Sequence, residues 1–307
     1  MTGREAQRTA SVQHRCAVIG HPAAHSLSPA LHMVAYETLG LSGWSYEAID
    51  VEPGHLDEFL SGLDSSWVGL SVTMPFKSAI IAHGTPEPLV TALDAANTII
   101  FGAVDGSRRT SRRESNRCYN TDVPGMTGAL AHRGLTSADS AILVGAGATA
   151  RSGLAALSRI GVRHAEVIAR SLERAHASLD EVAARYGIDL DVVGWGELSA
   201  PGGLGTDRAD LLLSIAPVDF TDAEAARIVR AAPVVFDVFY ERHPSALSLA
   251  AAAAGRVSVD GIDLLVFQGI GQVQLMTGLT PDPEPLLAAC AAELARRRDS
   301  QARRRDS

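Results

Sequence analysis

Apolar residues in the first 122 positions fall into short runs that alternate with helical patterns. Runs of strand length predict β-strands, whereas apolar residues three or four positions apart predict helices. The first helix is expected to begin with Ser28 as its N-cap and Pro29 in its first turn. The predicted strands cover residues 16–20, 44–51, 68–72 and 97–101, and a second helix covers residues 56–63.

From residue 123 onward, predicted helices and strands alternate regularly. This alternation is typical of a parallel, doubly wound sheet with helices on both faces, so the chain is predicted to be an α/β protein. A long helix is expected over residues 263–277 and a last helix over 286–297. The end of the chain, 299–307, repeats an RRRDS run and is predicted to be disordered. A length of 307 residues suits two domains.

Composition excludes several classes of protein. Hydrophobic residues make up 46% of the chain and charged residues 20%, which is typical of a globular protein rather than a disordered one. A formal net charge of −8 argues against a nucleic-acid partner. No apolar run reaches the length of a membrane span, so no membrane partner is expected.

Cysteine and histidine usage predicts a reduced, cytoplasmic protein without a metal. Three widely spaced cysteines argue against a disulfide framework or a zinc ribbon. The polar leader over residues 1–13 has no apolar core and does not look like a signal peptide. His21, His25 and His32 lie close together, but their spacing fits no standard zinc site.

The basic residues are almost all arginines: of 27, only Lys77 is a lysine. An arginine serves wherever a permanent cation is needed, but its pKa stays above about 12, so it cannot give up a proton. Lys77 is therefore a candidate for proton transfer, although its survival by chance is the alternative. Five arginines crowd the polar segment 105–117, which is interpreted as an exposed loop between two strands.

A glycine-rich loop follows the strand AILV and opens a helix. It has the form G-x-G-x-x-A, which in a strand–turn–helix context predicts a dinucleotide site, whereas a plain glycine-rich turn is the alternative. The first glycine allows the tight turn, the second lets a pyrophosphate approach the backbone, and the alanine permits close packing. The loop consists of Gly145, Ala146, Gly147, Ala148, Thr149 and Ala150.

The end of the next predicted strand indicates NADP rather than NAD. An NAD-selective fold places an acidic residue there, but this chain has Ala169 followed by Arg170, Ser171 and, one turn on, Arg174. Two guanidinium groups at this position suit a 2′-phosphate, with two solvated surface arginines as the alternative.

Four polar clusters lie in loops or at strand ends of the first half: His25–Pro29, Ser71–Lys77, Ala96–Thr98 and Asn120–Asp122. Open α/β sheets bind ligands at the carboxyl ends of their strands, and Lys77 follows such a strand. The Asn and Asp clusters are able to supply several groups that bind hydroxyls to the same crevice.

These clusters resemble the motifs of the shikimate dehydrogenase family. The matching segments, in the family's order, are GHPAAHSLSP, GLSVTMPFK, AANT, NTDVPG, GAGATA, FDVFY and LLVFQGIGQVQLMTG, and they span about residues 16–295. The resemblance implies a substrate-binding domain over residues 14–122, completed by C-terminal helices within 262–298. It also implies an NADP-binding Rossmann domain over 123–261 and the reversible, NADPH-dependent reduction of 3-dehydroshikimate to shikimate.

The resemblance also implies roles for single residues. Lys77 would act as general acid and base beside Asp122, and Ser26, Ser28 and Tyr240 would bind the substrate carboxylate. The ring hydroxyls would be held by Thr73, Asn97, Asp122 and Gln268, and Ser71 is included although the family usually has Asn there. The coenzyme site would consist of the glycine loop, Arg170, Ser171, Arg174, Ala216 and Gly261.

Two other functions stay open on the sequence. A paralogue on the same scaffold would oxidise quinate or an amino analogue of shikimate, and a regulator would bind a shikimate-like ligand without catalysis. The partner is expected to be a small molecule, and the protein a monomer or homodimer.

Overall fold

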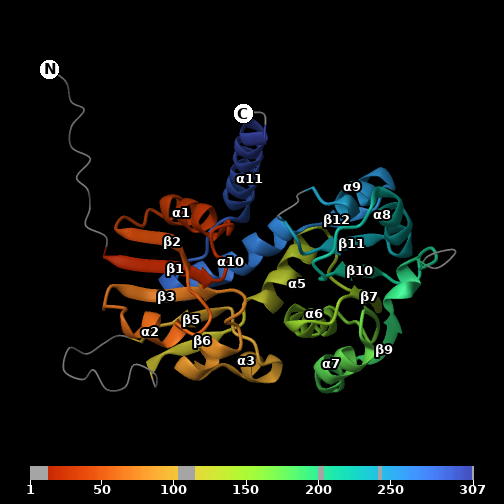
Figure 1. Cartoon of the computed structure of the whole chain (residues 1–307), viewed down its shortest axis with the longest axis horizontal. Helices are drawn as coiled ribbons and strands as arrows, with labels where there is room; N and C mark the ends of the chain where they lie inside the picture. The colour runs from red at the N-terminus through yellow and green to blue at the C-terminus, as the bar shows by residue number, and fades with distance from the viewer. Residues whose placement is uncertain (1–12, 103–114, 200–203, 241–243, 306–307) are drawn as a thin grey trace.

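The strands form two six-stranded sheets that lie side by side (Figure 1). Helices α5 (Asp122–His132) and α10 (Gly261–Thr277) lie between them. The structure, a computed structural model, describes residues 13–102, 115–199, 204–240 and 244–305. The predicted leader up to residue 12 and residues 105–114 of the Arg-rich loop lie outside the described residues.

The first sheet is mixed, with the strand order β2-β1-β3-β5-β6-β4. Its strands are β1 (His14–Gly20), β2 (Trp44–Asp50), β3 (Trp67–Val72), β4 (Thr85–Pro86), β5 (Thr98–Ile100) and β6 (Arg117–Tyr119). The connecting helices are α1 (Ser28–Thr38), α2 (Leu56–Ser61), η1 (Ala79–His83) and α3 (Pro88–Leu93). β1 and β3 run parallel, whereas β5 is antiparallel to both β3 and β6. The end of β3, the start of β5 and the end of β6 therefore meet at one edge.

The second sheet is entirely parallel, with the order β12-β11-β10-β7-β8-β9. Its strands are β7 (Ser140–Val144), β8 (His164–Ala169), β9 (Asp189–Gly194), β10 (Leu211–Ser214), β11 (Val234–Asp237) and β12 (Val257–Val259). The remaining helices here are α6 (Ala148–Arg159), α7 (Leu172–Tyr186), η2 (Trp195–Ser199), α8 (Asp222–Ile228), η3 (Val229–Ala231) and α9 (Ala246–Ala253). The reversal of strand order at β7 is that of a doubly wound sheet, which confirms the predicted fold class.

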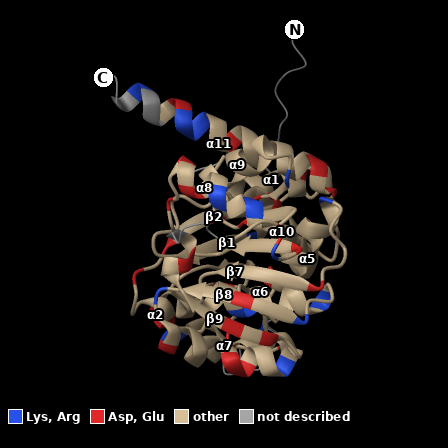
Figure 2. Ribbon diagram, turned by 90° about the vertical axis from the view of Figure 1, so that its right-hand side faces the viewer, with Lys and Arg blue, Asp and Glu red and all other residues tan. Residues whose placement is uncertain are grey.

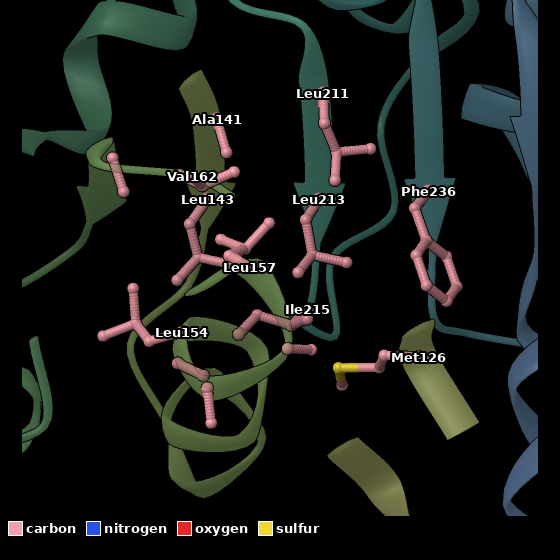
Figure 3. Close-up of a cluster of buried hydrophobic side chains, with 14 of the residues drawn as sticks. Met126, Ala141, Leu143, Leu154, Leu157, Val162, Leu211, Leu213, Ile215 and Phe236 are labelled. Atoms are coloured by element: carbon pink, nitrogen blue, oxygen red, sulfur yellow. The ribbon is translucent and has the colours of Figure 1, made fainter. Parts of the chain in front are cut away.

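Helices cover both faces of this parallel sheet because side chains alternate along each strand. Leu143 packs into a cluster with α5, α6 and α7, whereas its neighbours Ile142 and Val144 pack against α8 and α9. Figure 3 shows the first of these clusters, in which Met126 of α5 lies beside Ile215 and Phe236. Helix α5 thus contributes apolar side chains to the core of the second sheet while its first residue belongs to the edge of the first.

The last helix, α11 (Pro283–Arg305), is longer than the sequence predicts. Residues 299–305 continue it, so the prediction of a disordered end is wrong for them, and 306–307 lie outside the described residues. After Pro285 the segment contains no Pro or Gly and is rich in Ala, Leu and Arg, which favour helix. Glu293 also pairs with Arg296 and Arg297, three and four positions on.

The start of α1 also differs from the prediction. Its N-cap is Leu27, and Ser28 is the first helical residue, with no capping hydrogen bond from a side chain. The side-chain contact lies one step before the helix: the Ser26 hydroxyl oxygen accepts a hydrogen bond from the backbone N–H of Ser28 at 3.2 Å. Pro29 lies in the first turn, as predicted.

Helices α5 and α10 pack unusually close together. A Cβ atom on Gly125 would lie 2.8 Å from the backbone nitrogen of Gln268, so no larger residue fits without moving a helix. Near one end of the contact, Arg133 makes a two-pronged ion pair with Asp263, at 2.9 and 3.1 Å. Burial raises the pKa of Asp263 above its usual value, although Arg133 opposes this shift.

We expect Arg133→Ala to lower the free energy of unfolding by about 3 kcal/mol at neutral pH, because it leaves a buried carboxylate without its cation. The folded-state pKa of Asp263 is raised, so its contribution to stability is present at low pH and is lost as pH rises through that pKa. Without Arg133 the pKa of Asp263 rises further, because the cation that opposed the shift is gone. Near pH 4 more of the carboxyl is protonated, so Arg133→Ala should lower the free energy of unfolding by less there than at neutral pH.

Urea unfolding at both pH values measures this loss. The control is Arg185→Ala, which breaks an exposed pair with Glu181 and is expected to cost under about 0.5 kcal/mol. Equal losses for the two variants would contradict the role given to Arg133.

Candidate active site

Three of the four predicted polar clusters, Ser71–Lys77, Ala96–Thr98 and Asn120–Asp122, meet at the edge where β3 and β6 end and β5 begins. The backbone N–H of Val72 donates to the carbonyl of Asn97 at 2.7 Å, and the N–H of Asn97 donates to the carbonyl of Tyr119 at 3.0 Å. The antiparallel placement of β5 is the reason: it turns the start of that strand toward the ends of its neighbours.

Lys77 and Asp122 form a direct ion pair at this edge. The Lys77 Nζ lies 2.7 Å from Oδ2 of Asp122, and the side chains are 18% and 6% exposed. Phe76, which is buried, anchors the loop after β3, and the Lys77 carbonyl accepts from the N–H of Ala96 at 2.8 Å. Asp122 is the first residue of α5. The ammonium group is therefore partly accessible, whereas its carboxylate partner is enclosed.

The buried side chain of Asn97 fixes the orientation of this carboxylate. Its amide nitrogen donates to the other oxygen of Asp122, Oδ1, at 2.8 Å, to Oγ1 of Thr121 at 2.9 Å and to Oε1 of Gln268 at 3.1 Å. Its amide oxygen accepts from the N–H of Thr121 at 2.8 Å. Because Oδ1 is held by Asn97, Oδ2 is left for Lys77.

Ser71 belongs to a buried hydrogen-bond chain rather than to an open surface. Its hydroxyl accepts from the Tyr46 hydroxyl at 2.6 Å and donates to Oε1 of Gln272 at 2.8 Å. The Gln272 amide nitrogen donates to Oγ1 of Thr98 and to the carbonyl of Asn97, both at 3.1 Å. A serine has one proton to donate, so Ser71 retains only acceptor capacity.

Tyr46 and Gln272 were not among the predicted site residues. Tyr46 lies in an alternating strand that the sequence indicates correctly, and Gln272 follows Gln268 by one helical turn. That spacing placed both glutamines on one face of the helix and was the available signal.

The Ser26–Ser28 loop lies at the start of α1. Ser26 is half-buried and Ser28 is buried, and the carbonyl of Ser28 accepts a hydrogen bond from Nδ1 of His32 at 3.0 Å. Burial lowers the pKa of His32 to about 3, so this histidine is neutral. Its ring stacks on Tyr46 with 3.8 Å between centroids. His32 therefore has a packing role, and the described residues place no metal-binding cluster around it.

Two more predicted substrate residues lie close to these elements. Thr73 directly follows β3, and its backbone N–H donates to the carbonyl of Ile19 at 2.9 Å. Tyr240 follows β11 of the second sheet and packs against the apolar cluster that contains Leu27 and Leu31. The segment after β11 thus reaches an apolar cluster to which the start of α1 also belongs.

The glycine loop fits a dinucleotide phosphate. Gly145 has a φ of +110°, which favours glycine, and a Cβ there would lie 3.0 Å from the backbone nitrogen of Ala216. Gly147 is the N-cap of α6 and has no side chain with which to cap the first N–H groups of this 12-residue helix. A Cβ on Gly147 would meet nothing within 4 Å, so the backbone is open on that side. Ala150 is fully buried.

The predicted 2′-phosphate residues lie at the end of β8. Arg170 is exposed, and its guanidinium lies 5.9 Å from the ring centre of Trp195, which follows β9. Ser171 is the N-cap of α7 and accepts from the N–H of Arg174 at 3.4 Å. Among the described residues, neither arginine forms an ion pair with a carboxylate. Both charges are therefore available to an anion.

Close packing requires a glycine at position 261, which the sequence did not indicate. A Cβ there would lie 2.5 Å from the carbonyl oxygen of Val238, so α10 begins in contact with the segment after β11. Its assignment to the coenzyme site stays a prediction.

The described part of the chain lacks two features that would indicate other kinds of site. Within residues 13–102, 115–199, 204–240 and 244–305, no group of His, Cys, Asp and Glu could hold a metal ion. No helix in those ranges is long and apolar enough to cross a membrane.

Fold and site define a two-domain α/β protein with a doubly wound sheet of the dinucleotide-binding kind. Residues 18–99 match the family model of the shikimate dehydrogenase substrate binding domain. A curated shikimate dehydrogenase (NADP(+)) from Halorubrum lacusprofundi is 32% identical over 286 residues, which cover 90% of this chain and 98% of that protein. The chain therefore belongs to the shikimate dehydrogenase family.

Solved structures agree with this assignment. The crystal structure of shikimate dehydrogenase from Mycobacterium tuberculosis matches with a TM-score of 0.77 at 31% identity, covering 91% of this chain and 99% of that one. Shikimate 5-dehydrogenase from Thermus thermophilus, solved with NADP(H) and shikimate, matches with a TM-score of 0.73 at 29% identity, covering 91% and 99%.

Proposed function

We propose that this chain is an NADP-dependent shikimate dehydrogenase, which reversibly reduces 3-dehydroshikimate to shikimate. The observation that carries the proposal is the Lys77–Asp122 ion pair, held at one strand edge by Asn97. The substrate and the coenzyme are inferred from family membership. The loop Gly145–Ala150, together with Arg170 and Arg174, offers groups that fit NADP.

Bound NADPH would supply the hydride that reduces the ketone carbon. Hydride addition places negative charge on the carbonyl oxygen, and a positioned acid has to protonate it. In our proposal, the Lys77 ammonium donates this proton and becomes a neutral amine. In the oxidation direction, the amine takes the hydroxyl proton back. Asp122 accepts a hydrogen bond from Nζ and so directs the lysine, while Asn97 prevents the carboxylate from rotating.

The remaining predicted residues would bind the substrate. Ser26, Ser28 and Tyr240 would hold its carboxylate, and Thr73, Asn97, Asp122 and Gln268 its hydroxyls. Ser71 would add a contact only as an acceptor, because its proton is used by Gln272. A hydroxyl or amino group on the substrate would satisfy it, whereas a carboxylate would not.

The test is an assay of the purified chain with shikimate or quinate and with NADP or NAD, followed at the nicotinamide absorbance band. We expect the highest kcat/KM for shikimate with NADP. A higher kcat/KM for quinate with NAD would indicate the quinate-oxidising paralogue instead. No turnover in any combination would indicate a ligand-binding regulator.

In the same assay, Lys77→Arg is expected to lower kcat by about 10²–10⁴-fold, because the guanidinium keeps the charge but gives up no proton. Shikimate binding, measured by calorimetry, should weaken far less than kcat falls. A variant that retains near wild-type kcat would remove Lys77 from the proton-transfer role.

Coenzyme choice is tested at the end of β8. We expect Arg170→Ala and Arg174→Ala each to raise the KM for NADP by about tenfold, because each removes a charge-assisted contact to the 2′-phosphate. The KM for NAD, which has no such phosphate, should change little. Arg159→Ala, at the far end of α6, is the matched control and should leave both values unchanged. Equal effects on NAD and NADP would contradict the assignment.

A further inference from the structure

The loop that carries Ser26 and Ser28 is held from outside by the last helix. The Arg297 guanidinium of α11 donates from Nη1 to the carbonyl of His25 at 2.8 Å and from Nη2 to the carbonyl of Ser26 at 3.1 Å. We propose that Arg297 is a positioning residue, which fixes this loop in the conformation that binds the substrate carboxylate. The inference rests on the proposed function, because it takes the two serines as substrate ligands.

The loop depends on such outside contacts because residues 21–27 form neither helix nor strand. At its first end, the N–H of Ala23 donates to the side chain of Asp50 at 3.0 Å. Within it, Ser26 donates its N–H to the carbonyl of Ala23 at 3.0 Å. Arg297 supplies partners for two successive carbonyls at the other end, just before Ser28. The loop is thus fixed on both sides, by β2 and by α11.

An arginine suits this position better than a lysine would. Its planar fork points several N–H groups in fixed directions, so that one side chain binds two carbonyls and a carboxylate together. The third contact runs from Nε of Arg297 to Oε1 of Glu293 at 2.7 Å. Two hydrogen bonds from Arg296 and one from Arg297 lower the pKa of Glu293 to about 2. Glu293 therefore stays ionised at neutral pH and keeps the guanidinium turned toward the loop.

The packing of α11 brings Arg297 to the loop. Leu286, Cys290 and Leu294 lie on one face of α11 and pack against Leu27, the N-cap of α1, and Leu31 within that helix. Arg297 follows Leu294 by three positions and so continues the same face. Figure 2 shows α11 running past the body of the protein toward its end, with basic residues along its last part.

The neighbouring Arg296 offers a matched control. Both arginines bind Glu293, but the side chain of Arg296 is 71% exposed, whereas that of Arg297 is 29% exposed. The guanidinium of Arg296 directs its hydrogen bonds to Glu293 and not to the loop. A change at Arg296 therefore alters charge and the pair with Glu293 while leaving the loop contacts in place.

The experiment compares full-length wild type with Arg297→Ala, Arg297→Lys and Arg296→Ala. For Arg297→Ala we expect the KM for shikimate to rise by about tenfold with kcat within about twofold of wild type, since two charge-assisted hydrogen bonds to the loop are lost. Arg297→Lys should show an intermediate KM, and Arg296→Ala should match wild type. The KM for NADP should not change in any variant. Hydrogen exchange of the amides of residues 23–28 should become faster in Arg297→Ala, to a smaller extent in Arg297→Lys, and not at all in Arg296→Ala.

An unchanged KM for shikimate in Arg297→Ala would overturn the proposal. So would a parallel rise in the KM for NADP, or an equal effect of Arg296→Ala, because either would indicate general destabilisation or a charge effect. A wild type without turnover would overturn the proposed function instead. In that case unchanged exchange of residues 23–28 in Arg297→Ala would still disprove the anchoring.

Discussion

The amide side chain of Asn97 joins the parts of the chain that make up the candidate active site. It connects the start of β5 to Thr121 and Asp122 of the α5 start and to Gln268 of α10. A buried amide left without partners costs about 1–3 kcal/mol for each unsatisfied group, so losing any of these partners is unfavourable. The orientation of Asp122, and through it the position of Lys77, follows from this one side chain.

Close packing of α10 makes the arrangement possible. Gly125 brings α5 against Gln268, and a Cβ on Gly269 would lie 2.8 Å from the side chain of Leu31 in α1. Helix α10 therefore touches the helix that begins with Asp122 and the helix that follows the serine loop. The Arg133–Asp263 pair fixes its first turn, and the Asp260 side chain caps that turn. A shift of α10 would move the groups proposed to bind the hydroxyls and those proposed to bind the carboxylate together.

Local rules were enough to predict much of this from the sequence. Strand and helix periodicity indicated the doubly wound sheet, and the polar residues at strand ends indicated Lys77, Asn97 and Asp122, which the structure brings together. What the sequence could not show depends on partners far along the chain. Tyr46 and Gln272 are buried polar residues whose roles appear only once β3 and α10 lie beside each other. The prediction that Ser28 is the N-cap of α1 was wrong for a local reason. Ser28 is already helical, and its N–H donates to the hydroxyl of the neighbouring Ser26.

The arginine-rich composition now has a physical explanation that differs from site to site. Arg133 and Arg297 each bind two oxygens at once, with the fixed fork that a lysine lacks, and both join segments more than 100 positions apart. On the sequence, Arg297 is one cation among many near the end of the chain, because a run of like charges gives no indication of which member faces the protein.

Lys77 differs from these arginines, because its contact does not require this particular side chain. Its single nitrogen meets one carboxylate oxygen, a contact for which an arginine would also serve, so structural need alone does not account for a lysine there. The ability to release a proton is the property that separates the two side chains at this position.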